Sequence, residues 1–218
     1  MVDAFRASTT IAVLVSAGVR VLTVASPEAA RAATADYRAA ERGSKKLPGF
    51  DLGNSPTEAA TAELRPGSIL ALTTTNGTRI IEAARGAAEI LIGAFVNAEA
   101  VADSVAGPLE EPSGLEVAVI GCGWRGKRAS EDERAAGAIL HRLSGRGATL
   151  DVRAERVVDA YRNRPRRELY RNAAARRLKT LGYGHDLDFC LTEDSVTVVP
   201  RLTDGLFLPF GAFEGTGR

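Results

Sequence analysis

Residues 69–84 read Ile69-Leu70-Ala71-Leu72-Thr73-Thr74-Thr75-Asn76-Gly77-Thr78-Arg79-Ile80-Ile81-Glu82-Ala83-Ala84. The first residues form a short apolar run typical of a buried strand, and the last five have helical character. The loop between them contains hydroxyl and amide side chains, one glycine and one arginine. A helix start offers unpaired backbone N–H groups and the positive end of the helix dipole, so this loop is suited to hold an anion. An ordinary capped turn is the alternative, because Asn-Gly is a common turn dipeptide.

Strand-like and helix-like segments alternate on both sides of this unit. Cap residues followed by proline at Ser26-Pro27 and Ser55-Pro56 start two of the helices. The predicted strands are 19–24, 69–73, 89–92, 115–120 and 195–199. The predicted helices are 8–17, 26–40, 55–64, 80–85, 97–105, one that begins at 130, and 151–181, which is rich in arginine and interrupted at Pro165. This pattern predicts a three-layer α/β/α fold with a largely parallel or mixed sheet, in which ligands bind at the carboxyl ends of the strands.

Length and composition predict one compact unit over residues 1–218, with an internal subdivision near 107–114. The net charge of +1 gives no reason to expect nucleic acid or a membrane surface as a partner. Two cysteines are too few for a disulfide framework, and no apolar run approaches the roughly 20 residues that span a bilayer. We therefore expect a cytoplasmic protein, and a homodimer because small α/β enzymes are often symmetric dimers.

Several further motifs occur in a fixed order along the chain. They are Asp3-Ala4-Phe5-Arg6-Ala7-Ser8-Thr9-Thr10, Glu41-Arg42-Gly43, Gly49-Phe50-Asp51-Leu52-Gly53-Asn54-Ser55-Pro56, the loop Thr73–Arg79, Gly93-Ala94-Phe95-Val96-Asn97 and Ser130-Glu131-Asp132-Glu133-Arg134. In this order they resemble the 2-phosphosulfolactate phosphatase family, the ComB-type enzymes of coenzyme M biosynthesis. The resemblance runs from Val2 to about Ala138, and more loosely through Asp188-Phe189-Cys190 and Val199-Pro200.

The resemblance implies an enzyme that hydrolyses (R)-2-phospho-3-sulfolactate, or a related phosphorylated 2-hydroxy acid, to sulfolactate and phosphate. It also implies a small anionic phosphorylated substrate. The family has an opening strand before the Asp3–Arg6 segment, whereas Asp3 is almost the first residue here. The position of Asp3 relative to that strand is therefore an open question at this stage.

Acidic residues near the predicted strand ends could bind magnesium, which prefers oxygen ligands. Phosphate ester hydrolysis requires that a dianion be neutralised and a water molecule be oriented. The predicted metal ligands are Asp3, Glu41, Asp51 and Asp132, whereas Glu131 and Glu133 are sufficiently explained as acids in a first helical turn. Asp3, Arg6 and Asp132 are the predicted catalytic residues, although Asp3 and Arg6 alone would also fit a surface ion pair.

The substrate's negative charges call for polar side chains, arginine and helix-start N–H groups. The predicted substrate-binding residues are Ser8, Thr9, Asn54, Ser55, Thr74, Thr75, Asn76, Gly77, Thr78, Arg79, Asn97, Gly123 and Arg125. Ser55 and Asn97 are equally explained as helix caps.

Two alternative functions remain open from the sequence. Cys122 and Arg128 have the C-x5-R spacing of cysteine-dependent phosphatases, whose thiolate needs nearby cations to lower its pKa. A non-catalytic sensor of a phosphorylated or sulfonated metabolite could use the same loops. The acidic residues among these loops argue against a sensor unless a cation bridges them to the anion.

Overall fold

The computed structural model describes residues 1–109 and 116–210. The strands are β1 (Arg20–Val24), β2 (Tyr37–Ala39), β3 (Glu41–Arg42), β4 (Lys45–Lys46), β5 (Ile69–Thr73), β6 (Pro200–Thr203) and β7 (Leu206–Pro209). The helices are α1 (Ala7–Ser16), α2 (Pro27–Ala32), α3 (Pro56–Thr61), α4 (Thr75–Ala83), α5 (Ala98–Leu109), α6 (Ser130–Gly145), α7 (Val152–Asn163), α8 (Ala173–Thr180) and α9 (His185–Leu191), with short 3-10 helices η1 (Phe95–Asn97) and η2 (Arg166–Arg171).

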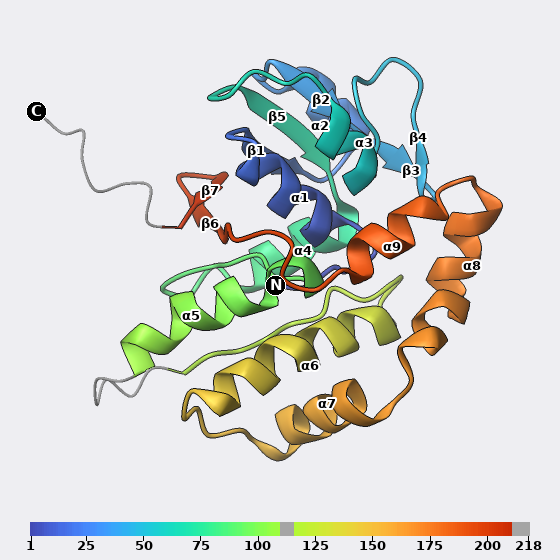
Figure 1. Ribbon diagram of the computed structural model, residues 1–218. Helices are drawn as coiled ribbons and strands as arrows, with labels where there is room; N and C mark the ends of the chain where they lie inside the picture. Colours follow the sequence, from blue (N-terminus) through green and yellow to red (C-terminus); the bar gives the residue numbers. More distant parts are fainter. Residues whose placement is uncertain (110–115, 211–218) are drawn as a thin grey trace, which may run out of the picture.

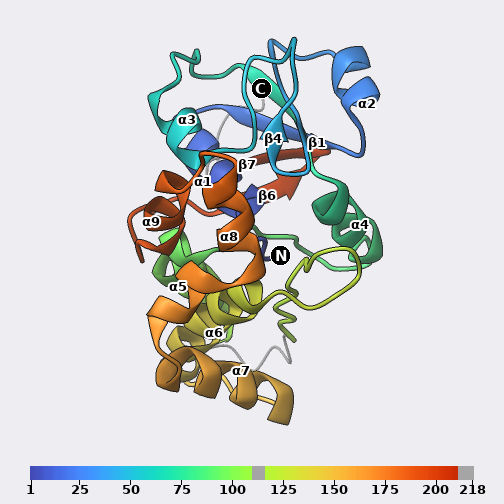
Figure 2. The same ribbon diagram turned by 90° about the vertical axis from the view of Figure 1, so that its right-hand side faces the viewer.

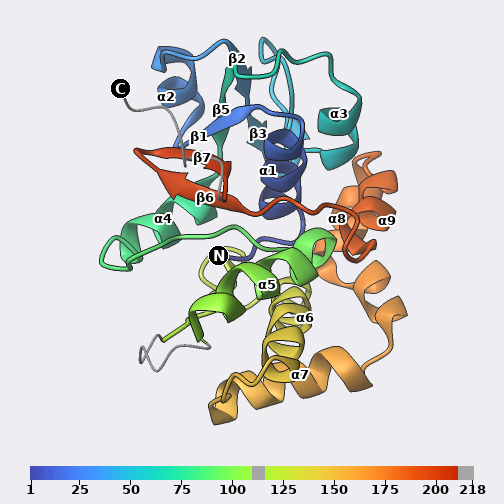
Figure 3. The same ribbon diagram turned by 60° about the vertical axis from the view of Figure 1, so that its left-hand side comes forward.

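The main sheet is mixed, with the strand order β2-β5-β1-β7-β6. β2, β5 and β1 are parallel, whereas β7 pairs antiparallel with β1 and with β6. The β6–β7 hairpin, which comes from the end of the chain, lies against β1 (Figures 1 and 3). These observations confirm the predicted α/β class with a largely parallel or mixed sheet.

Helices cover both faces of this sheet because its strands are apolar on both sides. Leu70 and Leu72 of β5 pack with Ile11 and Leu14 of α1 on one face. Ala71, which points to the opposite face, packs with the buried residues of the α2 side. Side chains alternate along a strand, so the single run 69–73 supplies both interfaces.

Side-chain caps start the helices where the sequence predicts them. Ser26 Oγ accepts a hydrogen bond from Ala29 N at 3.1 Å, and Ser55 Oγ accepts one from Glu58 N at 3.2 Å. Thr74 Oγ1 caps α4 in the same way by accepting from Gly77 N at 3.1 Å. Each cap satisfies one N–H group that the helix leaves unpaired.

The predicted helix over 26–40 is wrong beyond Ala32. The backbone becomes extended at Ala33, and Tyr37–Ala39 form β2, which pairs parallel with β5. Pairing with a distant strand therefore overrides the local helical pattern. Residues 41–54, which the sequence predicts to be a polar, glycine-rich loop, also contain structure. Within them β3 and β4 form a hairpin around Gly43 and Ser44, both with positive φ.

Three predicted strands do not form ladders in the described part of the chain. Residues 89–92 contain one isolated bridge, Leu91 to Arg201, and residues 116–120 contain no strand, while residue 115 lies outside the described residues. The strand predicted at 195–199 is displaced to β6 and β7. The extended segments at 91–93 and 120–122 instead bond to Met1 and Val2, with Val2 N donating to Ile120 O at 2.8 Å and Gly93 N donating to Met1 O at 3.0 Å.

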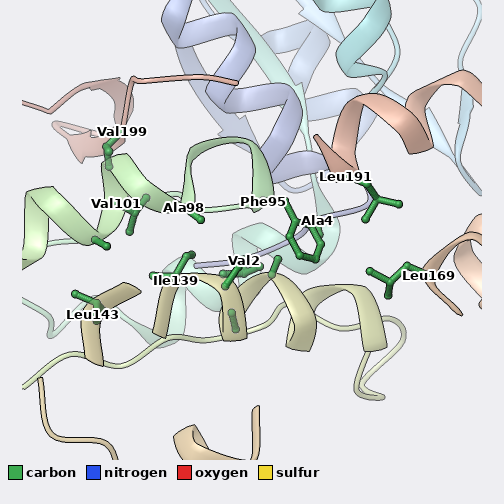
Figure 4. Packing of buried hydrophobic residues seen from close by; sticks show 14 residues of the cluster. Val2, Ala4, Phe95, Ala98, Val101, Ile139, Leu143, Leu169, Leu191 and Val199 are labelled. Carbon is green, nitrogen blue, oxygen red and sulfur yellow. The ribbon is translucent and has the colours of Figure 1, made fainter. Parts of the chain in front are cut away.

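A second apolar core lies below the sheet, between the first residues of the chain, α5 and α6. Figure 4 shows Val2 and Ala4 beside α6, with Ile139 next to Val2 and Phe95 next to Ala4. Val2, Ala4, Phe95 and Ile139 are all buried. This core fixes the backbone on both sides of Asp3, the residue between Val2 and Ala4.

The helical segment predicted over 151–181 is confirmed as α7, η2 and α8, with the interruption at Pro165. α7 packs on the outer side of α6 (Figure 1), and α8 leads to α9, which packs against α3 and η1. Residues 110–114 of the predicted subdivision lie outside the described residues, and α5 extends to Leu109. In the described ranges, no helix combines the length and apolar composition that a membrane crossing requires.

Candidate active site

A pocket of about 680 Å³ opens where the carboxyl end of β5, the start of α1 and the first turn of α6 meet. The β3–β4 hairpin, the turn before α6 and the first turn of α8 complete its wall. Figure 2 looks toward this side, with the hairpin containing β4 above, α8 on one side and the turn before α6 below α4. The pocket therefore lies at the sheet edge where a parallel α/β fold places its ligands.

Four acidic residues line this pocket: Asp3, Glu41, Glu131 and Asp132. Asp132 is 3% exposed, and its two carboxylate oxygens accept hydrogen bonds from Ala4 N and from Gly123 N, both at 2.8 Å. Asp132 thereby joins the entry of α1 to the turn before α6. Asp3 Oδ1 accepts from Ala7 N at 3.3 Å, while Asp3 N donates to Ser8 Oγ at 2.7 Å.

Burial disfavours the ionised forms of all four acids. It raises the pKa of Asp3 to about 7, and the charges of Glu41 and Glu131 add to the increase. The pKa of Asp132 is also raised, first by burial and then by Asp3. The pKa values of Glu41 and Glu131 are raised by burial too. A cavity that holds several acids with raised pKa values would be stabilised by a bound cation.

The oxygen atoms that these pocket residues offer are of the kind that magnesium binds. The donors are carboxylate oxygens, and two hydroxyl or amide oxygens that belong to lining residues, Asn54 Oδ1 and Thr73 Oγ1, are buried without a hydrogen-bond partner in the described structure. Within residues 1–109 and 116–210, no three Asp, Glu, His or Cys side chains form a ready-made metal cage. Magnesium does not require one, because it keeps several waters and uses one or two carboxylates.

Arg6 is 2% exposed and is held by other residues of the chain. Its Nη1 donates to Asp186 Oδ2 at 2.6 Å, and its Nη2 contacts Glu41 Oε2 at 3.2 Å and donates to Ser44 O at 2.8 Å. Its guanidinium also lies 4.5 Å from the ring centre of Tyr183. Arg6 therefore positions Glu41 and the β3–β4 hairpin at the pocket wall.

Asp186 connects several residues around Arg6, and the sequence pattern does not predict this role. It is fully buried in α9, and its Oδ1 accepts from Ser55 Oγ at 2.7 Å and from the hydroxyl of Thr57. Asp186 thus connects α9 to α3 and to Arg6. Its local sequence is that of an ordinary first helical turn, so only the tertiary structure identifies it.

The loop at the end of β5 contributes part of what the sequence predicts. Thr73, Thr74 and Asn76 line the pocket, and Asn76 Nδ2 donates to Gly123 O at 3.1 Å. Arg79 is exposed and does not line it. The predicted contact between Arg79 and the substrate anion is therefore not available at the pocket wall in this structure.

The other predicted residues divide into two groups. Those that line the pocket are Asp3, Arg6, Glu41, Asn54, Thr74, Asn76, Gly123, Arg125 and Asp132. Those that do not line it are Ser8, Thr9, Asp51, Ser55, Gly77, Thr78, Arg79 and Asn97, while the side chain of Thr75 lies outside the described part of the structure.

Four residues of the second group have partners elsewhere in the fold. Thr9 Oγ1 donates to Ala4 O at 3.1 Å, and Thr78 donates to Thr74 O. Asp51 is exposed and accepts from Arg38 N at 2.8 Å. Asn97 is buried, accepts from Ala94 N at 2.9 Å and ends η1 directly before α5.

The surroundings of Cys122 do not activate a thiolate. Burial and the nearby charges of Asp3 and Asp132 raise the pKa of this thiol. Arg128, the cation of the C-x5-R pattern, forms an ion pair with Glu133. A cysteine nucleophile requires the opposite environment, with cations that lower the thiol pKa.

Comparison with known proteins places the chain in one family. Residues 1–205 match the family model described as 2-phosphosulpholactate phosphatase. A relative from Gloeobacter violaceus is 36% identical over 209 residues, which cover 93% of this chain and 86% of the relative. One from Synechococcus sp. (strain CC9605) is 39% identical and covers 92% and 86%, and one from Thermotoga maritima is 37% identical and covers 77% and 71%.

All three relatives are named probable 2-phosphosulfolactate phosphatase. The match to the family model extends over all the residues that line the pocket, from Asp3 to Arg177. The chain belongs to the 2-phosphosulpholactate phosphatase family.

Proposed function

We propose that this protein is a magnesium-dependent phosphatase that hydrolyses (R)-2-phospho-3-sulfolactate, or a closely related phosphorylated 2-hydroxy acid, to sulfolactate and phosphate. The names of its relatives support the substrate. The observation that carries the proposal is the group of four buried or half-buried acids, with raised pKa values, in one pocket beside the start of α4. A cation bound between these acids would neutralise them and let an anionic ester approach.

Asp3, Glu41 and Asp132 would hold the ion. When bound, magnesium would neutralise the phosphate oxygens and stabilise the charge that develops on phosphorus. The residues of the chain would perform the remaining tasks. Glu41 is kept in place by Arg6, and Asp132 by the backbone N–H groups of Ala4 and Gly123.

Asp3 would orient the attacking water and accept its proton. One of its oxygens is fixed by Ala7 N, and its carboxylate lies in the pocket wall, where it could accept a proton from a bound water. In this step the water oxygen forms a bond to phosphorus and the bond from phosphorus to the ester oxygen breaks. The proton taken from the water is then available to the leaving alkoxide.

Thr74 and Asn76 would position the phosphoryl group at the start of α4. Thr74 belongs to the cap, and Asn76 lies in the first turn, where backbone N–H groups and the helix dipole favour an anion. The bond from Asn76 to Gly123 keeps this loop against the turn before α6. The phosphate would therefore lie between α4 and the acids.

The direct test is release of phosphate from phosphosulfolactate by the purified protein. We expect activity with magnesium, loss of activity with EDTA and recovery when excess magnesium is added. Full activity after exhaustive chelation would contradict the metal requirement. Binding of phosphosulfolactate without any phosphate release would instead support a sensor.

Replacing Cys122 with serine is expected to retain most of the activity. The raised thiol pKa leaves little thiolate at neutral pH, and Arg128 is paired elsewhere. Steady-state kinetics and mass spectrometry of iodoacetamide-treated protein check this. Loss of activity by several orders of magnitude in Cys122→Ser, with a folded protein, would favour the cysteine mechanism.

The ion-free protein is expected to lose stability as the pH rises from about 4 to about 7. Asp3 has an ordinary value of 3.8 and a folded pKa of about 7, so in this window the folded state keeps a proton that the unfolded chain releases. Magnesium favours the ionised acids and should reduce this dependence. Thermal unfolding at pH 5 and pH 8, with EDTA and with magnesium, measures both effects; ion-free protein that is more stable at pH 8 would contradict the assignment.

A further inference from the structure

Arg177 of α8 lies half-buried in the wall of the same pocket. Its Nε donates to Ser44 Oγ at 2.9 Å, and its guanidinium lies 4.1 Å from the ring centre of Trp124. Ser44 belongs to the β3–β4 hairpin, and Trp124 belongs to the turn before α6. Arg177 is therefore held from both sides of the pocket.

Trp124 and Ser44, the two residues that hold Arg177, are themselves held by hydrogen bonds. Trp124 and Lys127 exchange backbone hydrogen bonds of 2.8 and 3.0 Å around Arg125 and Gly126, both of which have positive φ. This is the geometry of a tight hairpin turn. On the opposite side, the carbonyl of Ser44 accepts from Arg6. The guanidinium plane of Arg177 is thus preorganised before any ligand enters.

Arg177 differs in its partners from three other arginines whose side chains are buried or half-buried. Arg6, Arg142 and Arg146 form ion pairs with carboxylates. Arg177 has no carboxylate within ion-pair distance in residues 1–109 and 116–210, and of its nitrogens Nε alone makes a hydrogen bond to those residues. Its Nη atoms therefore offer two donors in a fixed plane, which matches a carboxylate or a sulfonate.

The first turn of α8 adds to the same wall. Asn172, Ala173 and Ala174 line the pocket, and Asn172 donates to Glu131 Oε2 at 2.8 Å. The positive charge of Arg177 partly offsets the increase that burial causes in the pKa values of Glu41 and Glu131. Both acids lie on the α8 side of the pocket. Arg177 thus lies across the pocket from the α4 loop, which is suited to the phosphate.

We propose that Arg177 recognises the acid group of the substrate that is remote from the phosphate ester, and so sets the preference for phosphorylated acids over simple phosphate monoesters. This inference rests on the proposed phosphatase function. A substrate that spans the pocket would place its phosphate at the α4 loop and its carboxylate or sulfonate at Arg177. Trp124 and Ser44 act as positioning residues for the guanidinium.

The test compares Arg177→Ala and Arg177→Lys with Arg176→Ala, a substitution of the exposed neighbour on the same helix. The substrates are phosphosulfolactate and p-nitrophenyl phosphate, which lacks both acid groups. For Arg177→Ala we expect kcat/KM on phosphosulfolactate to fall about 10- to 100-fold, as for loss of a hydrogen bond between charged groups. Activity on p-nitrophenyl phosphate should change less than about threefold on the same reasoning.

Arg177→Lys should recover part of the loss, because lysine keeps the charge and loses the planar fork. Equal losses on both substrates, or no loss on phosphosulfolactate, would overturn the proposal. 2-Phospholactate, with a carboxylate only, and phosphorylated isethionate, with a sulfonate only, show which group Arg177 contacts.

Calorimetric binding of sulfolactate separates this inference from the phosphatase proposal. If the wild-type protein hydrolyses no ester, the proposed function fails, yet weaker sulfolactate binding in Arg177→Ala would still support the role of Arg177. Unchanged binding in Arg177→Ala would overturn it. Circular dichroism and thermal unfolding of each variant establish that the fold is retained.

Discussion

Replacing Asp3 with asparagine is expected to lower kcat by about 10²- to 10⁴-fold, the range for loss of a positioned acid or base. Asparagine has nearly the same size, and its amide oxygen can still accept the hydrogen bond from Ala7 N. The variant therefore keeps the entry of α1 and loses the proton acceptor. Phosphate release from phosphosulfolactate in the presence of magnesium measures the effect.

Asp51→Asn is the matched comparison, because the sequence predicts Asp51 as a metal ligand and the structure places it outside the pocket. We expect Asp51→Asn to keep wild-type kcat within about twofold, as for a surface substitution. A large loss in Asp51→Asn, together with normal activity in Asp3→Asn, would reverse the two assignments. Ion-free Asp3→Asn should also be more stable than the wild type at pH 8, because it removes a buried charge.

Replacing Asp186 with leucine is expected to lower the free energy of unfolding by about 3–5 kcal/mol, the cost of breaking a buried ion pair from one side. Arg6 and Asp186 are 2% and 0% exposed and are 2.6 Å apart. Without Asp186, the Arg6 guanidinium keeps its hydrogen bond to Ser44 O and one longer ion pair, to the partly exposed Glu41. Urea denaturation followed by circular dichroism gives the free energy.

The double variant Arg6→Met with Asp186→Leu supplies the control. It removes both charges, and apolar replacement of a whole buried pair is often neutral or stabilising. We expect it to recover most of the lost stability and to remain poorly active, since Glu41 then lacks the cation that positions it. A double variant no more stable than Asp186→Leu would show that the pair is not the source of the effect.

The sequence predicts best those elements whose signals are local. Ser26-Pro27 and Ser55-Pro56 start α2 and α3 as expected, and β5 is correct in position. The helix after β5 is also correct in type, but it begins at Thr75, inside the segment predicted as a loop. Residues 37–39 show where prediction from a local pattern fails. They continue a helical pattern but form β2, because β5 offers an edge for parallel pairing that is remote in the sequence.

The sequence likewise predicts some residues of the site and misses others. Asp3, Glu41 and Asp132 meet in the pocket as predicted. Asp186 and Arg177 could not be predicted, because each lies in a short helix whose pattern does not show which turn faces the pocket. The magnesium requirement, the homodimer and the cytoplasmic location remain predictions.

Ligand binding in the pocket can be measured without an enzyme assay, by following proteolysis of the turn that Asp132 holds before α6. This turn exposes Arg125, Lys127 and Arg128, three points at which trypsin can cut the chain. Its anchors, Asp132 and Asn76, are themselves part of the pocket wall. A bound ion or substrate analogue that orders these anchors should slow cutting at the turn, so a timed digestion can screen ligands even before the reaction is known.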